Sequence, residues 1–167
     1  MMSHETDRTM LRIKHTGQVL IILFTVALTL VGCNRNTIYS HYESTPLEGW
    51  EINNQMLFEV GPIGLSGDYE TSLGLRTTTD YPYMGLTLIV EQTVWPSNWK
   101  SRDTVSVELV DRNGEFLGKG VSTFQYVSPI SVLHLDEGDS LKVTVRHYMA
   151  QKTLPGILDV GLVVNRR

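Results

Sequence analysis

The only cysteine of the chain, Cys33, is the residue best placed to do chemistry. It directly follows the tripeptide LVG and an uncharged apolar run over residues 19–31, which basic residues precede. A thiol at this position accepts a diacylglyceryl group as a thioether, the small residue before it gives a signal peptidase access, and the freed amine accepts another acyl chain, such as palmitate. The motif predicts a lipoprotein signal peptide over residues 1–32 and a mature chain that begins at lipidated Cys33.

Two alternatives for this segment are a transmembrane helix and an unreactive buried cysteine. The apolar run would span only about 20 Å as a helix, against about 30 Å of hydrocarbon in a bilayer. A sole cysteine at the end of such a run favours lipidation over burial. We therefore expect a membrane attachment through acyl chains, with residues 33–40 as the lipidated N-terminus and tether.

The residues after the cysteine bear on where the protein is delivered. Asn34 stands where an aspartate would retain a lipoprotein on the inner membrane in enteric-type sorting, so an outer-membrane destination is expected. Residues 34–37 carry no acidic cluster of the kind that marks export to the cell surface. We expect the domain to face the periplasm.

Catalytic and metal-binding patterns are weak in the rest of the sequence. His41, His134 and His147 stand apart from one another, with no HExxH motif and no second cysteine to complete a zinc site. The GLSG stretch at residues 64–67 is not a GxSxG nucleophile elbow, and residues 114–120 lack the spacing of a phosphate-binding loop. The sequence thus predicts no enzymatic activity, and no cofactor other than the covalent lipid on Cys33.

An acidic group at Asp136, Glu137 and Asp139 has two interpretations. Carboxylate oxygens in a loop are ligands for a hard cation such as calcium, but three acids alone leave its coordination shell incomplete. A solvated turn is the simpler interpretation, which Gly138 between the acids favours.

Four aromatic residues flank one predicted strand. Tyr81, Tyr83, Trp95 and Trp99 lie in or beside loops, where we expect them to gather at one end of the domain. Exposed aromatics of this kind stack on sugars or anchor a protein partner. The alternative is that they close the ends of the hydrophobic core.

Apolar residues in the mature chain recur with period 2, which is typical of strands with one buried face. The clearest alternation predicts strands over residues 71–76, 86–91, 104–109, 141–146 and 158–165. Shorter strands are expected over residues 37–42, 56–60, 115–119, 123–127 and 130–135. DRNG at residues 111–114 predicts a hairpin with a type I′ turn.

These elements predict an all-β fold, an antiparallel β-sandwich that is either Ig-like or a jelly roll, over residues 41–167. The chain of 167 residues has 41% hydrophobic and 19% charged residues, enough apolar material for one packed core. Its net charge of −4 argues against a nucleic-acid partner.

Several segments together resemble the GldH family of gliding-motility lipoproteins. They are LVGC at residues 30–33, the opening segment at 39–50, LRTTTDYPY at 75–83, DRNGEFLGKG at 111–120 and LPGILDVGL at 154–162. Two departures are visible, because Thr77 and Gly85 stand where that family usually has asparagine.

The resemblance implies a non-enzymatic outer-membrane lipoprotein of the gliding apparatus or an associated envelope process, with other envelope proteins as partners. A carbohydrate-binding lipoprotein that uses the same aromatics is the alternative. Within the shared segments, we expect an ion pair between Arg76 and Asp80 and a close approach of another backbone at Gly161.

Overall fold

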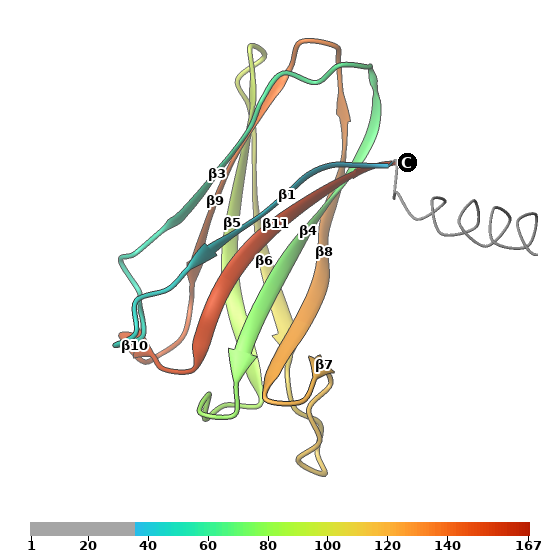
Figure 1. Ribbon diagram of the computed structural model, residues 1–167. Coiled ribbons are helices and arrows are strands. Elements are labelled where there is room, and N and C mark those ends of the chain that lie inside the picture. The colour runs from blue at the N-terminus through green and yellow to red at the C-terminus, as the bar shows by residue number, and fades with distance from the viewer. Residues whose placement is uncertain (1–35) are drawn as a thin grey trace, which may run out of the picture. The chain divides into compact units, whose positions relative to one another are not determined.

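The computed structural model describes residues 36–167, which form two packed antiparallel β-sheets (Figure 1). One sheet has five strands in the order β1-β11-β4-β8-β7, and the other has four in the order β3-β9-β5-β6. The strands of the first sheet are β1 (Thr37–Ser44), β4 (Gly67–Thr78), β7 (Lys119–Gly120), β8 (Thr123–Leu135) and β11 (Ile157–Arg166). Those of the second are β3 (Met56–Val60), β5 (Gly85–Trp95), β6 (Trp99–Glu108) and β9 (Ser140–His147), and β2 (Trp50–Glu51) pairs separately with β10 (Thr153–Leu154).

The connections between these strands follow a jelly roll. When the two-residue strands are set aside, successive strands alternate between the two sheets, except for the β5–β6 hairpin. The first strand, β1, lies beside the last, β11, and β3 lies beside β9. The sandwich expected from the sequence is confirmed, and its topology is that of a jelly roll rather than an immunoglobulin fold.

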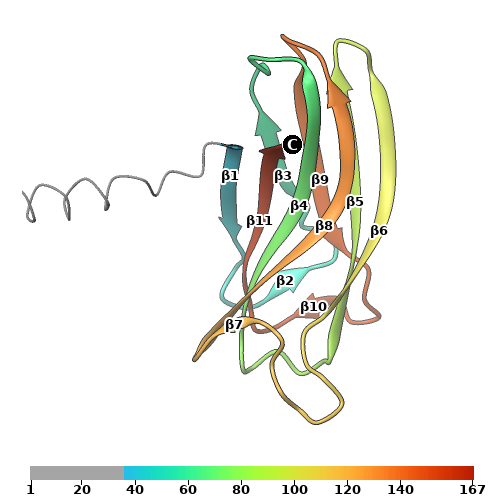
Figure 2. The same ribbon diagram turned by 90° about the vertical axis from the view of Figure 1, so that its right-hand side faces the viewer.

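The core lies between the inner faces of the two sheets. Leu73, Val160 and Leu162 from the five-stranded sheet are fully buried, as are Phe58 and Val143 from the other sheet. Each belongs to an alternating run, so the period-2 pattern puts its apolar residues on one face and its polar residues on the other. Figure 2 shows the two layers from the side, with β6 and β8 bordering the same flank of the sandwich.

The five strands expected from the clearest alternation are all present as β4, β5, β6, β9 and β11. The strand expected at 115–119 is not formed, because only Phe116 bridges back to Val110 and β7 begins at Lys119. The two strands expected at 123–127 and 130–135 are one continuous strand, β8, with a register shift at Pro129. An irregularity of one residue changes which side chains face inward, and this made one strand look like two.

The DRNG turn differs in type from the expectation. Only Gly114 has a positive φ, of 86°, whereas a type I′ turn would need positive values at two residues. The Asp111 carboxylate accepts bonds from the Asn113 and Glu115 amides at 2.9 and 2.8 Å, and these bonds hold the turn. They also lower the pKa of Asp111, the bond from Glu115 most. A side-chain-capped turn of three residues therefore replaces the type I′ turn.

β1 begins earlier than the expected domain boundary at residue 41. Thr37 is opposite Asn165, so residues 37–40, expected in the tether, belong to a strand that pairs with β11. The segment expected to be a signal peptide, residues 1–32, and Cys33, where lipidation is expected, lie outside the described residues. Within residues 36–167 there is no helix long and apolar enough to cross a membrane.

Candidate functional site

The four aromatic residues do not gather at one end. Tyr81 and Tyr83 lie in the β4–β5 connection, and Trp95 and Trp99 lie at the opposite end of β5, in the hairpin to β6. Tyr81 is buried and donates to the Gly85 carbonyl at 2.9 Å, and its burial raises the pKa of its hydroxyl. Tyr83 packs edge-on against it at 5.5 Å between ring centroids. The two tyrosines close the core, whereas the two tryptophans are exposed.

Trp99 lines an open groove on the described part of the molecule. This groove, of about 690 Å³, lies between the β5–β6 hairpin and the last residues of β8. Trp99 is 47% exposed. The other lining residues are Val94, Pro96, Ser97, Val132, Leu133, His134, Asp136 and Asp139. We call it the Trp99 groove.

Trp95 belongs to a different depression. Although it is 53% exposed and lies in the same hairpin, it lines a groove of about 430 Å³ beside Val60, Ser140 and Lys142. The alternation of side chains along the hairpin turns the two indoles toward different neighbours. Any site built on the Trp99 groove therefore uses one of the four aromatics expected from the sequence.

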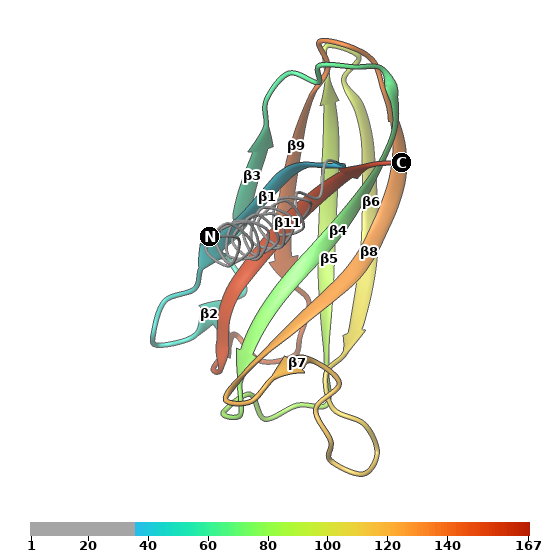
Figure 3. The same cartoon turned by 45° about the vertical axis from the view of Figure 1, so that its right-hand side comes forward.

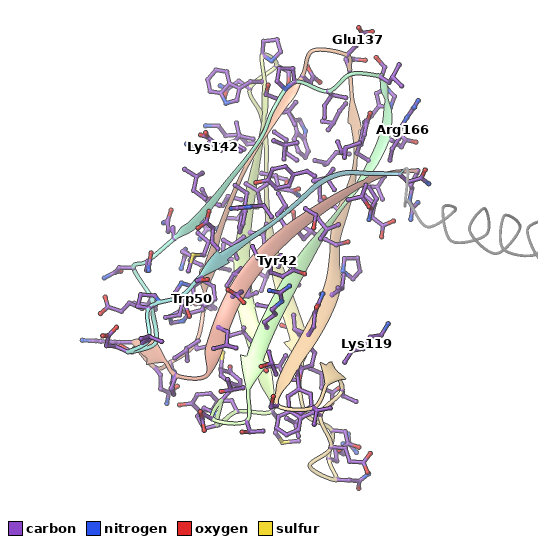
Figure 4. The ribbon with its side chains drawn as sticks, in the orientation of Figure 1. Tyr42, Trp50, Lys119, Glu137, Lys142 and Arg166 are labelled. Carbon is purple, nitrogen blue, oxygen red and sulfur yellow. The ribbon has the colours of Figure 1, made fainter. Side chains whose placement is uncertain are left out.

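The acidic group forms the turn between β8 and β9 at the upper end of the groove. Gly138 has a φ of 90°, and the Asp139 carboxylate accepts a bond from the Asp136 amide at 2.9 Å. Figure 4 labels Glu137 at the top of this turn. Among residues 36–167 no group of three histidine, cysteine or acidic side chains is arranged to hold a metal ion.

The three histidines have different surroundings. His134 lies 2.8 Å from Asp68, and this hydrogen bond raises the pKa of the exposed imidazole. His41 contacts Glu43 at 2.9 Å on the surface. His147 is fully buried, and neither of its ring nitrogens has a hydrogen-bond partner among the described residues.

A buried polar network joins the two sheets below the Trp99 groove. Gln92 on β5 is completely buried and donates to Ser131 on β8 at 2.8 Å and to Ser101 on β6 at 3.3 Å. Its carbonyl oxygen accepts a bond from the Thr71 hydroxyl on β4 at 3.0 Å. These contacts fix the spacing of the two sheets along the flank that carries the groove.

A second cluster, on the outer face of the five-stranded sheet, was not expected from the sequence. The Tyr42 ring lies over Gly161 and Gly74, which are neighbours on β11 and β4 (Figure 4). The guanidinium of Arg76 stacks over that ring at 4.4 Å from its centroid. The close approach expected at Gly161 is thus made by a tyrosine side chain and not by another backbone.

The same cluster contains an ion pair that differs from the expected one. Arg76 lies 3.5 Å from Asp159 on β11, its neighbour in the strand register, whereas Asp80 bonds locally to Thr78. The segments at 75–83 and 154–162 meet again where the Thr78 amide donates to the Gly156 carbonyl at 2.8 Å. The spacing along the chain did not reveal these contacts, because strand pairing creates them.

The fold and its surface define a class of protein, a jelly-roll β-sandwich domain with an open aromatic groove on one flank. A family model described as GldH lipoprotein matches residues 37–164. The chain belongs to the family of GldH lipoproteins, as the sequence resemblance indicated.

Curated relatives cover nearly the whole chain. The chain is 28% identical to the gliding motility lipoprotein GldH homolog of Christiangramia forsetii, over 89% of this chain and 94% of that protein. It is 24% identical to the gliding motility lipoprotein GldH of Flavobacterium johnsoniae, over 94% of this chain and 99% of that protein.

Two solved structures are similar in fold at low TM-scores. The globular domain of zebrafish complement 1qA covers 79% of this chain and 99% of its own length, with a TM-score of 0.43 and 15% identity. A family 35 carbohydrate-binding module from Clostridium thermocellum covers 78% of this chain and 90% of its own, with a TM-score of 0.40 and 9% identity.

Proposed function

We propose that this chain is a lipid-anchored, non-enzymatic component of the cell envelope that docks a partner through the Trp99 groove. The acyl chains on Cys33 hold it on the outer membrane, with the sandwich facing the periplasm. Its process is gliding motility or an associated envelope function, a proposal supported by the names of the two relatives.

The observation that carries the docking proposal is the exposed indole of Trp99 in a groove of about 690 Å³. A large aromatic side chain at the surface of a paired hairpin offers much contact area at little cost in side-chain conformational entropy, as is typical of residues that dominate binding energy. The groove also contains apolar residues from β8, so a partner would bury more than the indole alone.

The anchor is tested by replacing the cysteine. Cys33→Ser removes the thiol that accepts the lipid, and we expect complete loss of radioactive palmitate from the protein and its release from the membrane fraction. Equal labelling of both forms, or no labelling of the wild type, would contradict the proposal.

Docking is tested with a matched pair of substitutions in one hairpin. Trp99→Ala should abolish complementation of a deletion strain, because it removes the indole that lines the groove, while Trp95→Ala should complement fully. Both variants must reach wild-type amounts in the membrane fraction. Full complementation by Trp99→Ala would show that the groove is not the docking site.

A carbohydrate ligand is the second candidate for the same groove. Asp136 and Asp139 line one end of the groove and Trp99 lines one wall, so carboxylates that accept bonds from sugar hydroxyls border the same space as an indole that stacks on a sugar ring. A glycan array with the purified protein checks this alternative. Signals at background on every glycan would remove it.

A further inference from the structure

The outer edge of β8 is largely unpaired. β8 pairs with β4 from Thr123 to Leu135, but on its other side β7 covers only Phe124 and Gln125. On this outer side, no strand in the described part of the chain pairs with residues 130–135, which begin at Ile130, the unpaired residue of the register shift between Pro129 and Ser131. We call residues 130–135 the free edge of β8. An edge of this kind presents unpaired main-chain N–H and C=O groups.

The Trp99 groove runs along this edge rather than across a face of the sheet. Its β8 wall consists of the successive residues Val132, Leu133 and His134, whose side chains alternate between the two faces. Because residues that face opposite sides of the sheet both line the groove, the groove lies against the main chain of β8. Figure 3 shows β6 beside β8 along this flank, and Trp99 from β6 forms the opposite wall.

Apart from the register shift at Ile130, the free edge of β8 lacks the features that usually protect edge strands. Natural edges carry lysine, proline, other charged residues or bulges that prevent pairing with another chain. β6 has Lys100 and Arg102 on its edge, and β1 has Glu43 and a register shift near its start. Residues 130–135, with the sequence ISVLHL, contain no lysine, arginine, acidic residue or proline.

The chain itself shows that this side of β8 accepts a strand. Lys119 lies opposite Gln125 in antiparallel register, at the lower end of β8 (Figure 4). The segment before it then turns away, because the Leu117 amide donates to the Leu109 carbonyl of the preceding loop. The position that β7 occupies for two residues is therefore vacant farther along β8, toward the Trp99 groove.

Charge adds a requirement for the occupant. Asp136 and Asp139 line the end of the groove, and the one basic side chain among its lining residues is His134, which lies 4.0 Å from Asp136 and also bonds to Asp68. The hydrogen bond from the Asp136 amide engages only one oxygen of Asp139. A basic side chain beside these carboxylates would therefore gain a favourable interaction, and an acidic one would be repelled.

We propose that an extended segment of a partner protein adds to the five-stranded sheet as a strand along residues 130–135. Its main chain pairs with the free edge of β8, an apolar side chain packs against Trp99, and a lysine or arginine lies beside Asp136 and Asp139. About six residues are needed, since each residue of a strand spans about 3.3 Å and the edge is about 20 Å long. This inference rests on the proposed docking function and names the chemistry of its partner.

The test selects peptides on the purified full-length lipoprotein in detergent, from a display library of ten-residue sequences. We expect enriched peptides with alternating apolar residues and a basic residue near one end. The best peptide should bind at least ten times more weakly once alternate residues are N-methylated, because this removes main-chain donors and leaves the side chains. Hydrogen exchange at the amides of residues 130–135 should slow when the unmodified peptide is bound.

A matched pair of valines provides the control. Val132 and Val121 are both exposed, but only Val132 lies on the free edge of β8. Val132→Lys should weaken peptide binding at least tenfold with an unchanged thermal midpoint, while Val121→Lys should bind as wild type. Equal binding of the N-methylated peptide, or no enrichment of any peptide, would overturn strand addition.

Two further outcomes assign the edge to another occupant and also overturn the proposal. One is a wild-type dimer that Val132→Lys dissociates, which would make the occupant a second copy of the chain. The other is saturable glycan binding that a Trp99→Ala substitution removes. None of these results depends on the anchor, so palmitate labelling and complementation by the Trp99→Ala variant test the proposed function separately.

Discussion

The pKa values of two histidines, His147 and His134, are shifted in opposite directions because their surroundings differ. His147 is fully buried between Trp50, whose ring lies 5.3 Å away, and the core, and burial lowers its pKa. Main-chain groups at Trp50 and Lys152 oppose this shift without reaching hydrogen-bond geometry. The exposed His134 has its pKa raised by the bond to Asp68. Folding therefore disfavours protonation of His147 and favours protonation of His134.

The sign for His147 follows from the lowered pKa. Above about pH 6.5 the residue is neutral in both the folded and unfolded states and has no effect on pH dependence. Below that pH the unfolded chain binds the proton more readily, so stability falls, by at most about 1.4 kcal/mol per pH unit, until the folded pKa is reached.

We predict that His147→Leu reduces this loss of stability in acid. The substitution also removes two buried nitrogens that have no partner, so the variant should be at least as stable as wild type at neutral pH. Urea unfolding midpoints at pH 7.5 and 5.5 provide the measurement. An equal fall in midpoint for both proteins would contradict the prediction.

Asp68→Asn serves as the control for the other histidine. The stabilisation that His134 gains from Asp68 is present below about pH 6.5 and is lost as pH rises through the raised folded pKa. Removing the carboxylate should therefore lower stability more at pH 5.5 than at pH 7.5. This pattern is opposite in sign to that of His147→Leu.

At the scale of single strands, Gly161 on β11 is held by the side chain above it. A Cβ at this position would lie 2.6 Å from the Tyr42 ring. We predict that Gly161→Ala destabilises the fold by about 1–2 kcal/mol, because the ring must move off the sheet and lose its contact with Arg76. Thermal or urea unfolding measures the change.

Gly161→Ala should no longer destabilise the fold when Tyr42 is absent. In a Tyr42→Ala background the space above the strand is open, and alanine in a strand is about 0.5–1 kcal/mol more favourable than glycine. Gly161→Ala should then be neutral or stabilising. An equal cost in both backgrounds would show that the constraint comes from the backbone and not from Tyr42.

Local patterns were enough to predict most of the strands. β9 alternates apolar and polar residues throughout, and β5 and β11 do so over most of their length, with Ile89 and Val163 as exceptions; this alternation depends only on neighbours in the chain. β8 was divided in two because the register shift at Pro129 breaks the alternation. The segment at 115–119 does not form a strand for a different reason: it has the expected alternation, but only Phe116 forms a bridge, to Val110.

Contacts between strands could not be predicted, because they depend on the register in which the strands pair, and the sequence does not show this register. Arg76 is close to Asp80 in the chain but opposite Asp159 in the sheet. Trp95 and Tyr81 flank one strand, and the length of β5 places them at opposite ends. The Trp99 groove depends on β6 and β8 bordering one flank, and the jelly-roll connections determine that arrangement. The sequence alone therefore does not distinguish Trp99 from the other three aromatic residues expected to make contacts.

At the scale of the whole molecule, Gln92 connects the two sheets through buried hydrogen bonds. We predict that Gln92→Leu costs about 2–3 kcal/mol, because it leaves the buried hydroxyl of Thr71 and the half-buried hydroxyl of Ser131 with fewer partners. Chemical unfolding of the variant measures this cost.

The triple variant Thr71→Val, Gln92→Leu, Ser131→Ala replaces all three polar groups and should lose less than the sum of its single changes. Strictly additive costs would mean that the three residues act independently. The Ser101 hydroxyl, which also contacts Asp103 at 3.2 Å, stays partly satisfied in each of these variants.

The early start of β1 has a mechanical consequence. Only three residues separate Cys33 from Thr37, and they reach at most about 10–14 Å between those positions when fully extended. Tension applied through a lipid at that cysteine would enter the fold at the first residue of β1, an outermost strand with no buried residue. We expect this strand to detach from β11 before the interior yields, so the pulling force that the domain withstands is set by one ladder of hydrogen bonds and the Tyr42 ring.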